Sequence, residues 1–314
     1  MNSKIVQVAA GVVVNQQGKI LVAKRPLEKH QGGLWEFPGG KIENDETAHQ
    51  ALARELQEEV GIHITVSEPL IKINHSYPDK TVCLHVLRVT EFKGNAWGCE
   101  GQEIAWVSPD KLLYLEFPAA NTPIVAAARL PETLMITGNF DTANECLQKL
   151  ERGLAKAPGM VQFRAPWLSG DDYLALALRV HAMCRARSIP LIANCALPIF
   201  QAIAGEGLHL TSAKLKSAKG RPVGGDIWLS AACHDLSDLQ QAEAIGADFV
   251  TLSPVLATAT HPNQAALDWN EFGRLAENAC VPVYALGGMG VDDISAAKVY
   301  GAQGIAAIGD FWGS

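Results

Sequence analysis

Eight short apolar segments in the C-terminal part of the chain limit the folds that it can adopt. They are residues 134–137, 161–164, 191–194, 207–211, 228–231, 249–252, 283–286 and 304–308, and stretches with helical spacing such as 172–186, 238–245 and 292–300 lie between them. Strands that alternate with helices are typical of a parallel sheet, and eight of them predict a TIM (β/α)8 barrel. Because about 180 residues are few for this fold, some of its helices must be short.

The first 130 residues follow a different pattern, which indicates a second domain. Here β-rich segments at residues 6–14, 20–23, 81–89 and 104–107 surround a long helical segment at 46–60, and a second helix at 121–130 ends before Pro131. A chain of 314 residues is also about as long as two domains. We therefore expect an α/β protein with domains at residues 1–131 and 132–314.

The composition argues against several classes of partner. A formal net charge of −7 disfavours binding to duplex nucleic acid, which needs clustered Lys and Arg. The seven cysteines are odd in number and contain no C-x-x-C pair, so neither a disulfide framework nor a zinc site is indicated. The N-terminus does not have the pattern of a signal peptide, and no apolar stretch nears the ~18 residues of a membrane span. We therefore expect a soluble, cytoplasmic protein with no membrane partner.

Three glutamates on the long helix of the first domain indicate a divalent cation. Glu55, Glu58 and Glu59 are spaced at i, i+3 and i+4, so their side chains lie on one side of the helix. By helical angle, Glu55 and Glu59 lie beside the apolar stripe that includes Leu56 and Val60. Burying like charges is costly unless a cation compensates them, and oxygen-only ligands favour Mg²⁺, or Mn²⁺, shared with substrate phosphates. The alternative is an acidic surface helix with ordinary i,i+4 ion pairs.

Residues near the two ends of this helix have expected roles of their own. Gly61 suits the left-handed residue that ends a helix, and Glu46 is expected in the first turn, where the helix dipole favours an anion. Arg54 is expected to pair with Glu58 one turn further on.

The chain from Gly40 to Ile62 matches the pattern G-x5-E-x7-R-E-U-x-E-E-x-G-U (U, a bulky apolar residue) at every position, and it therefore resembles the Nudix hydrolases. The flanking segments 23–26, 33–40, 77–79 and 118–123 narrow the resemblance to the MutT group, which hydrolyses oxidised purine nucleoside triphosphates. The resemblance implies an α/β/α sandwich with a mixed sheet. The implied metal ligands are Glu55, Glu58, Glu59, Glu100 and the carbonyl group of Gly39, and the implied nucleotide-binding residues are Arg25, Phe37, Tyr77, Asp79 and Asn121.

The same resemblance implies a reaction. Mg²⁺ would hold the triphosphate against an acidic protein, water would attack the β-phosphorus, and pyrophosphate would leave. Glu55 is the first candidate, and Glu100 the second, for positioning or deprotonating that water. Asn121 is the natural purine reader, because its amide offers a donor and an acceptor together. The alternatives are core packing for Phe37 and a surface ion pair for Arg25.

From about Leu134 the chain resembles the thiamin phosphate synthase and TenI superfamily. The segments that carry this resemblance are residues 161–164, 190–194, 207–210, 232–235, 246–249, 252–255 and 285–289. It implies that Gly287, Gly288 and Gly309 bind the phosphate of a thiazole or pyrimidine ligand through their backbone. It also implies that His234 transfers a proton, as in the TenI-type thiazole tautomerases. The alternatives are glycines that only form tight turns and a histidine with a structural role.

Three positions depart from the synthase. Cys195 follows Asn194 where the synthase has a metal-binding aspartate, and Ala213 and Lys214 stand near the place of a second aspartate. His261 replaces a lysine. These departures argue against the synthase reaction.

Three hypotheses for the function follow. The leading one is a magnesium-dependent 8-oxo-dGTP diphosphatase that cleans the nucleotide pool and is fused to a TenI-like barrel, active or vestigial. The second gives the N-terminal domain a thiamin-related diphosphate as substrate and makes the barrel a thiazole tautomerase. The third makes the barrel a non-catalytic, ligand-binding module.

Overall fold

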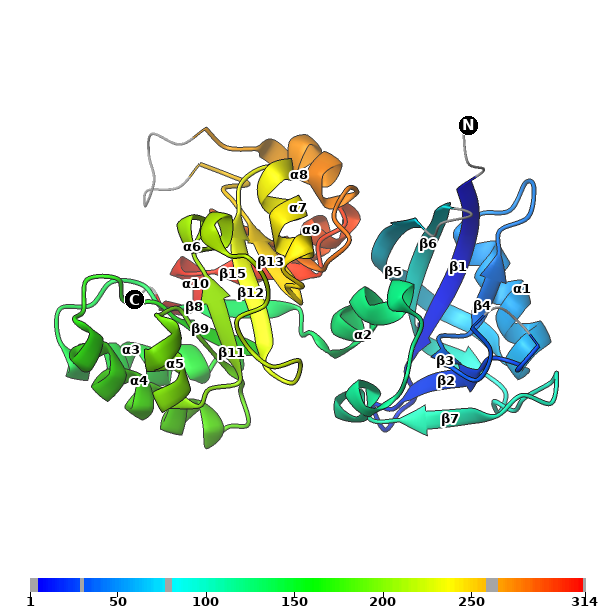
Figure 1. Cartoon of the computed structure of the whole chain (residues 1–314), viewed down its shortest axis with the longest axis horizontal. Coiled ribbons are helices and arrows are strands. Elements are labelled where there is room, and N and C mark those ends of the chain that lie inside the picture. The colour runs from blue at the N-terminus through cyan, green and yellow to red at the C-terminus, as the bar shows by residue number, and fades with distance from the viewer. Residues whose placement is uncertain (1–4, 29–30, 77–80, 258–264, 313–314) are drawn as a thin grey trace. The chain divides into compact units, whose positions relative to one another are not determined.

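The computed structural model describes residues 5–28, 31–76, 81–257 and 265–312. The chain divides into two compact units, residues 1–130 and 131–314, each with its own hydrophobic core (Figure 1). Within the described ranges, no helix combines the length and the apolar character needed to cross a lipid bilayer.

The N-terminal unit is an α/β/α sandwich built on a mixed four-stranded sheet, as predicted. The sheet has the strand order β4 (Gly39–Lys41), β1 (Ile5–Val13), β6 (Thr81–Lys93) and β5 (His63–Ser76), in which only β1 and β6 are parallel. A smaller antiparallel sheet joins β3 (Trp35–Glu36), β2 (Ile20–Lys24) and β7 (Ile104–Val107). The helical segments are α1 (Ala48–Val60), α2 (Thr122–Arg129) and the 3-10 turns η1 (Pro109–Tyr114) and η2 (Ala119–Asn121).

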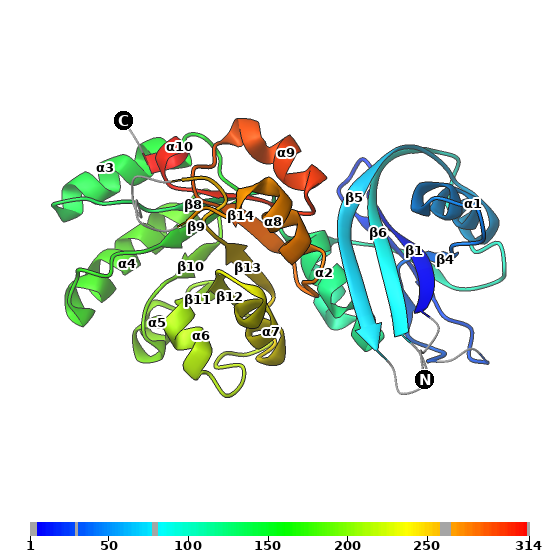
Figure 2. The same ribbon diagram turned by 90° about the horizontal axis from the view of Figure 1, so that it is seen from above.

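Strand β1 separates two apolar layers, because successive side chains of a strand point to opposite faces of the sheet. Ala9 and Val13 pack in the layer that contains α1, whereas Ala10 and Val12 pack in the layer that contains α2. The two helices therefore cover opposite faces of the sheet (Figure 2). Gly11 lies on the α1 side, where even a Cβ would come within 3.2 Å of a Leu52 methyl group, so α1 can approach the strand closely.

Helix α1 begins two residues later than predicted, because Thr47 caps it. The Thr47 hydroxyl accepts a hydrogen bond from the N–H of Gln50, and the Gln50 side chain accepts one from the N–H of Thr47. The prediction that Glu46 lies in the first turn is therefore wrong, and its carboxylate accepts a hydrogen bond from Arg54 instead. Gly61 ends the helix with a φ of 69°, as predicted.

The sequence does not predict β3, β4 or β5. Strands β3 and β4 are only two and three residues long. Strand β5 is an edge strand, and of its described side chains only Ile73 is buried. Its apolar alternation is confined to two short stretches, around Ile64 and around Ile73, and the register shifts that β5 shows against β6 between Ile64 and Ile71 interrupt it.

The C-terminal unit is a closed barrel of eight parallel strands, as predicted. The strands are β8 (Thr133–Ile136), β9 (Met160–Phe163), β10 (Leu191–Ala193), β11 (Gly207–Leu210), β12 (Trp228–Cys233), β13 (Phe249–Leu252), β14 (Val283–Leu286) and β15 (Gly304–Ala307). The helical segments are α3 (Ala143–Leu154), α4 (Gly170–Arg185), α5 (Leu197–Ile203), α6 (Ser212–Ser217), α7 (Leu236–Ala244), α8 (Asp268–Ala276), η3 (Val291–Asp293), α9 (Ile294–Val299) and α10 (Gly309–Trp312). The barrel closes where β15 pairs with β8, and helices surround its strands (Figure 2). Helices α6 and α9 have only six residues each, which confirms that some helices are short.

Candidate active sites

The first candidate site forms where α1 packs against β4 at the edge of the four-stranded sheet. Leu52 and Leu56 are fully buried and fix the face that α1 turns to the sheet. The N–H of Gly39 donates a hydrogen bond to Glu59 Oε2 at 3.1 Å. A Cβ on Gly40 would lie 2.2 Å from the carboxyl carbon of Glu55, so this approach requires glycine. We use the name carboxylate site for Gly39, Gly40, Glu55, Glu58, Glu59 and Glu100.

Arg54 binds several of the acidic side chains around this site. Its guanidinium lies 2.9 Å from Glu46, 2.8 Å from Glu55 and 3.3 Å from Glu58, which confirms the predicted pair with Glu58. These hydrogen bonds raise the pKa of Arg54. The pKa of Glu46 is lowered to about 2, mainly because Glu46 accepts a hydrogen bond from Arg54. Glu58 is exposed, whereas Glu55 is mostly covered. Ordinary ion pairs thus account for Glu58 and for part of the environment of Glu55.

Glu59 has no basic partner among the described residues. Burial raises the pKa of its carboxyl group to about 7, against the opposing effect of the Gly39 N–H. The negative charges of Glu36, Glu55 and Glu100 raise that pKa further. With a pKa of about 7 this carboxyl group is only partly ionised at neutral pH, and a nearby cation would favour its charged form. The environment of Glu59 therefore suits a cation ligand.

Glu100 reaches the carboxylate site from the loop between β6 and β7. The N–H of Cys99 donates to the carbonyl group of Glu59 at 2.9 Å, and the N–H of Trp97 donates to the carbonyl group of Val60 at 3.1 Å. Both acceptors belong to the last turn of α1, where carbonyl groups have no partner within the helix. These bonds hold the loop against the helix and bring Glu100 close enough to raise the pKa of Glu59.

The donors of the carboxylate site fit a hard divalent cation. Carboxylate oxygens and the Gly39 carbonyl group are the ligand types that Mg²⁺ and Mn²⁺ prefer, and Glu59 lacks a cationic partner within the described part of the chain. Across the same residues, no three His, Cys, Asp or Glu side chains already converge on one point. A cation would therefore draw Glu58 and Glu59 together, with Glu58 released from Arg54.

Two of the predicted nucleotide-binding residues have partners within the protein. Arg25 forms an ion pair with Glu36, the same residue whose charge raises the pKa of Glu59. Phe37 is 3% exposed and stacks on Phe117 with ring centroids 5.3 Å apart, so it belongs to the core, which is the alternative considered for it. No pattern in the sequence singles out Glu36, whose only signal is its place in the segment W-E-F-P-G-G.

Asn121 stands at the N-cap position of α2 without capping it. Its side-chain amide has no hydrogen-bond partner in the part of the chain that the structure describes. The segment that precedes Asn121 is held to β3 by the N–H of Trp35, which donates to the Glu116 carbonyl group at 2.9 Å, and by the stacking of Phe117 on Phe37. Since Phe37 precedes Pro38 and Gly39 in the chain, Asn121 is tied to the same segment that leads into the carboxylate site. Two further predicted residues lie outside the described ranges, Tyr77 and Asp79.

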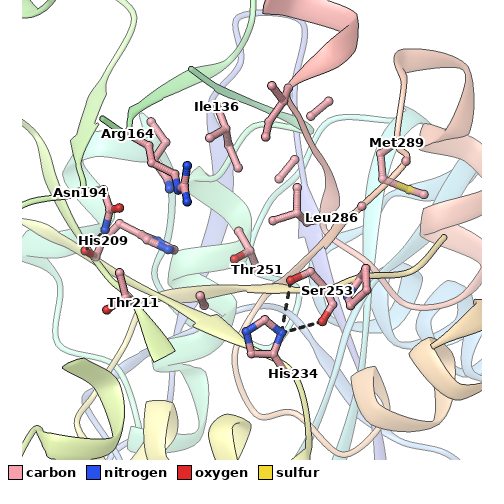
Figure 3. Close-up of a pocket in the computed structure, with 18 of the residues that line it drawn as sticks. Ile136, Arg164, Asn194, His209, Thr211, His234, Thr251, Ser253, Leu286 and Met289 are labelled. Carbon is pink, nitrogen blue, oxygen red and sulfur yellow. Dashed lines mark hydrogen bonds between the residues drawn. The ribbon is translucent and has the colours of Figure 1, made fainter. Parts of the chain in front are cut away.

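The second candidate site is a cavity of about 620 Å³ at the C-terminal ends of the barrel strands, which we call the barrel pocket (Figure 3). Its walls combine apolar side chains such as Ile136, Leu286 and Met289 with many polar ones. The polar lining residues are Gln162, Arg164, Asn194, His209, Thr211, Ser212, His234, Thr251 and Ser253. A cavity of this size and mixed lining is typical of a small-molecule site.

His234 follows β12 and lines the barrel pocket (Figure 3). Its Nδ1 lies 2.7 Å from the carbonyl oxygen of Ser253. Because a carbonyl group only accepts, Nδ1 carries a proton, and in the neutral form of the ring Nε2 would then be an acceptor. The backbone N–H of His234 donates to Asp238 Oδ2 at 3.1 Å. The ring is thus held in one orientation, and Nε2 has no partner among the described groups.

Arg164 and His209 also line the pocket, although the sequence analysis assigns them no role. The Arg164 side chain has no ion pair or hydrogen bond to another described residue. His209 is 4% exposed and its Nδ1 lies 2.9 Å from Ser230 Oγ, and burial lowers its pKa to about 3, helped by the charge of Arg164. The side-chain oxygens of Gln162 and Thr251 are buried without a hydrogen-bond partner. An anionic ligand that also donates hydrogen bonds would match this end of the pocket.

The predicted phosphate-binding glycines lie together in the lining of the pocket. Gly287 and Gly288 follow β14 with φ values of 105° and 72°, which glycine adopts without strain. The turn by itself therefore explains these two glycines. A Cβ on Gly309 would meet no atom within 4 Å, so space for a ligand remains there.

The positions that depart from the synthase lie beside the same pocket. Cys195 is buried directly after Asn194, and its carbonyl group accepts a hydrogen bond from Lys214 Nζ at 2.8 Å. Neither Cys195 nor Ala213 offers the carboxylate that a magnesium ion prefers, and Lys214 places a positive charge nearby. These residues do not suit a divalent cation. The third departure, His261, lies outside the described residues.

The two units match different families of known proteins. The sequence profile of the NUDIX domain matches residues 9–127. An 8-oxo-dGTP diphosphatase from Proteus vulgaris is 47% identical over 93 residues, which are 30% of this chain and 83% of the relative. A CTP pyrophosphohydrolase from Escherichia coli is 40% identical over 124 residues, which are 40% of this chain and 91% of the relative.

The remaining residues match a different family. The sequence profile described as thiamine monophosphate synthase covers residues 133–311. A putative thiamine-phosphate synthase 2 from Aquifex aeolicus is 31% identical over 182 residues, which are 58% of this chain and 98% of the relative.

Proposed function

Because the chain belongs to the Nudix family in its N-terminal unit and to the thiamine monophosphate synthase family in its C-terminal unit, we propose that the N-terminal unit is a Mg²⁺-dependent nucleoside triphosphate pyrophosphohydrolase. Its substrate is an oxidised purine nucleotide, 8-oxo-dGTP, and its products are 8-oxo-dGMP and pyrophosphate. Such a reaction would remove a mutagenic nucleotide before DNA synthesis. The observation that carries the proposal is Glu59, a partly buried acid among acids with no basic partner in the described residues.

The residues of the carboxylate site have distinct roles in this proposal. A bound Mg²⁺ supplies the positive charge that holds and polarises the phosphates. Glu59, Glu58 and the Gly39 carbonyl group would hold the ion. Glu55 positions or deprotonates the attacking water, since β4 and Arg54 fix its carboxylate, and Glu100 is the second candidate for this role.

Asn121 would recognise the oxidised base. Its amide can donate and accept at once, and no capping bond occupies it. A bidentate amide contact to a purine contributes roughly 1 to 3 kcal/mol of discrimination. The CTP pyrophosphohydrolase of E. coli makes a cytidine nucleotide the main competing substrate, and thiamin diphosphate is the competitor from the second hypothesis.

A substrate panel on the full-length chain tests these assignments. Hydrolysis of 8-oxo-dGTP, dGTP, CTP and thiamin diphosphate would be measured with and without Mg²⁺. We expect 8-oxo-dGTP to have the highest kcat/KM, and Asn121→Ala to reduce its preference over dGTP by roughly 5- to 150-fold. Asn278→Ala, an exposed asparagine of the other unit, is the matched control. A higher kcat/KM for CTP or thiamin diphosphate would refute the proposed substrate.

For the barrel, we propose proton transfer on a thiazole or pyrimidine phosphate, with His234 as the catalytic residue. The fixed tautomer supports this role, because Nε2 can take a proton from the ligand and return it. The glycines Gly287, Gly288 and Gly309 would bind the phosphate through backbone N–H groups. The residues at Cys195 and Ala213 argue against the metal-dependent synthase reaction.

Tautomerase assays with a thiazole phosphate distinguish an active barrel from a binding module. We expect His234→Gln to lower kcat by about 100-fold or more while ligand affinity, measured by calorimetry, stays within threefold. The exposed His63 provides a control variant, His63→Gln. Binding without turnover by the wild-type chain would favour the non-catalytic module, and full activity of His234→Gln would refute the catalytic role.

A further inference from the structure

The loop that carries Glu100 is held by one side chain at two points. Gln102 Nε2 donates a hydrogen bond to the carbonyl group of Glu59 at 2.8 Å. Gln102 Oε1 accepts a hydrogen bond from the N–H of Glu100 at 2.9 Å. Both ends of the amide are therefore used, and they join the backbones of two residues of the carboxylate site that are far apart in the sequence.

The loop is built so that Gln102 can fold back in this way. The N–H of Gly101 donates to the carbonyl group of Gly98 at 3.0 Å, which closes a tight turn around Cys99 and Glu100. A Cβ on Gly98 would lie 2.0 Å from the Gln102 carbonyl oxygen and 3.1 Å from its Oε1. Only glycine at residue 98 leaves room for this arrangement.

We propose that Gln102 is a positioning residue that sets the distance between the Glu100 and Glu59 carboxylates in the carboxylate site. Glu100 is exposed and lies on a loop, so burial of its side chain does not fix its place. Glu59, in contrast, belongs to a helix whose Leu56 and Val60 are fully buried. Through its two hydrogen bonds, Gln102 holds the loop at a fixed place relative to the end of the helix. This inference rests on the proposed function of the N-terminal unit.

The test is Mn²⁺ affinity, measured by electron paramagnetic resonance on the full-length chain without nucleotide. Gln102→Met removes both hydrogen bonds at nearly constant volume, and we expect it to weaken Mn²⁺ binding about tenfold or more, as loss of an outer-shell partner usually does. Gln50→Met is the matched control, because it removes a glutamine contact at the other end of α1. It should leave Mn²⁺ affinity within twofold of wild type. Equal affinities for the Gln102→Met and Gln50→Met variants would overturn the inference.

Two further variants separate positioning from a merely structural role. Gln102→Glu keeps the length and an acceptor for the Glu100 N–H but loses the donor to Glu59, so the link between helix and loop is broken and we expect Mn²⁺ binding to weaken about tenfold, as in Gln102→Met. Wild-type affinity in this variant would overturn the inference, even if Gln102→Met failed to fold. In a Glu100→Gln background, Gln102→Met should cause no further loss, since the two act through one carboxylate.

Measurements on the wild-type chain distinguish a failure of the proposed function from a failure of the role of Gln102. A chain that binds no Mn²⁺ and hydrolyses no nucleotide would overturn both the proposed function and the role of Gln102. A chain that does both, with the Gln102→Met variant unchanged, would overturn the role of Gln102 alone.

Discussion

Replacing Gly40 with alanine tests whether Glu55 must lie against β4. The new Cβ would lie 2.2 Å from the Glu55 carboxyl carbon, and ordinary contact begins near 3.4 Å. The carboxylate is the end of a flexible side chain, so we expect it to move away by about 1.2 Å while the backbone stays in place. A displacement of about 1 Å at a reacting group can cost about 100-fold in rate, or roughly 2.7 kcal/mol. We therefore expect kcat for nucleotide hydrolysis to fall about 100-fold in Gly40→Ala at saturating Mg²⁺.

The neighbouring glycine provides the contrast. A Cβ on Gly39 would lie 2.1 Å from the backbone oxygen of Ala9, and the φ of Gly39 is 149°. Because the backbone of β1 cannot move aside as a side chain can, Gly39→Ala should destabilise the N-terminal unit by roughly 2 to 6 kcal/mol. Gly40→Ala should stay within about 1 kcal/mol of wild type.

The assay combines rate and local stability in the full-length chain. Hydrogen exchange of peptides from α1 and β4 reports the N-terminal unit separately from the barrel, which a single thermal midpoint does not. Gly40→Ala should show wild-type protection with a low kcat, and Gly39→Ala should lose protection. A wild-type kcat in Gly40→Ala would refute the role of Glu55, and equal loss of protection in both variants would refute the geometric argument.

Two further predictions concern the barrel. The pKa of His209 is about 3 in the fold and near 6.5 in the unfolded chain, so the unfolded state binds more protons between these values. The unfolding free energy of the barrel should therefore fall by about 1.4 kcal/mol from pH 7.5 to pH 5.5, as measured by urea titration. The His209→Asn variant should show a smaller fall. An equal fall in this variant and the wild type would show that His209 is not the cause. Removing divalent cations with a chelator should stop nucleotide hydrolysis but leave thiazole tautomerisation within twofold of its starting rate, and a parallel loss of both would show that the barrel also needs a metal.

The elements that the sequence predicts correctly are those whose signal is local. The eight barrel strands and the long helix of the first unit each carry an apolar pattern that can be read within one segment. Strand β5 carries such a pattern only in two short stretches, because register shifts against β6 divide it. The start of α1 is also a local matter, but the Thr47 capping box outweighs the acidic residue before it.

In the candidate sites, too, the sequence predicts features within one segment but not contacts between segments. Helical spacing alone places Glu55 and Glu59 beside the buried stripe of α1, and the structure confirms this side of the helix. The partners of these acids come from other elements: Gly39 and Gly40 from β4, and Glu100 from the loop after β6. Spacing within one segment carries no information on such contacts.

The sequence by itself determined that an eight-stranded barrel follows a first α/β unit, and that the acids of this unit gather on one side of a helix. Periodicity and residue spacing within single segments are sufficient for both, whereas the mixed sandwich of the first unit was implied by its resemblance to the Nudix hydrolases. Only the tertiary structure decided that Phe37 belongs to the core, that Arg25 is paired with Glu36 and that Arg164 lines the barrel pocket. Burial and charge pairing depend on side chains that the fold brings together from distant parts of the chain, and no local pattern encodes those distances.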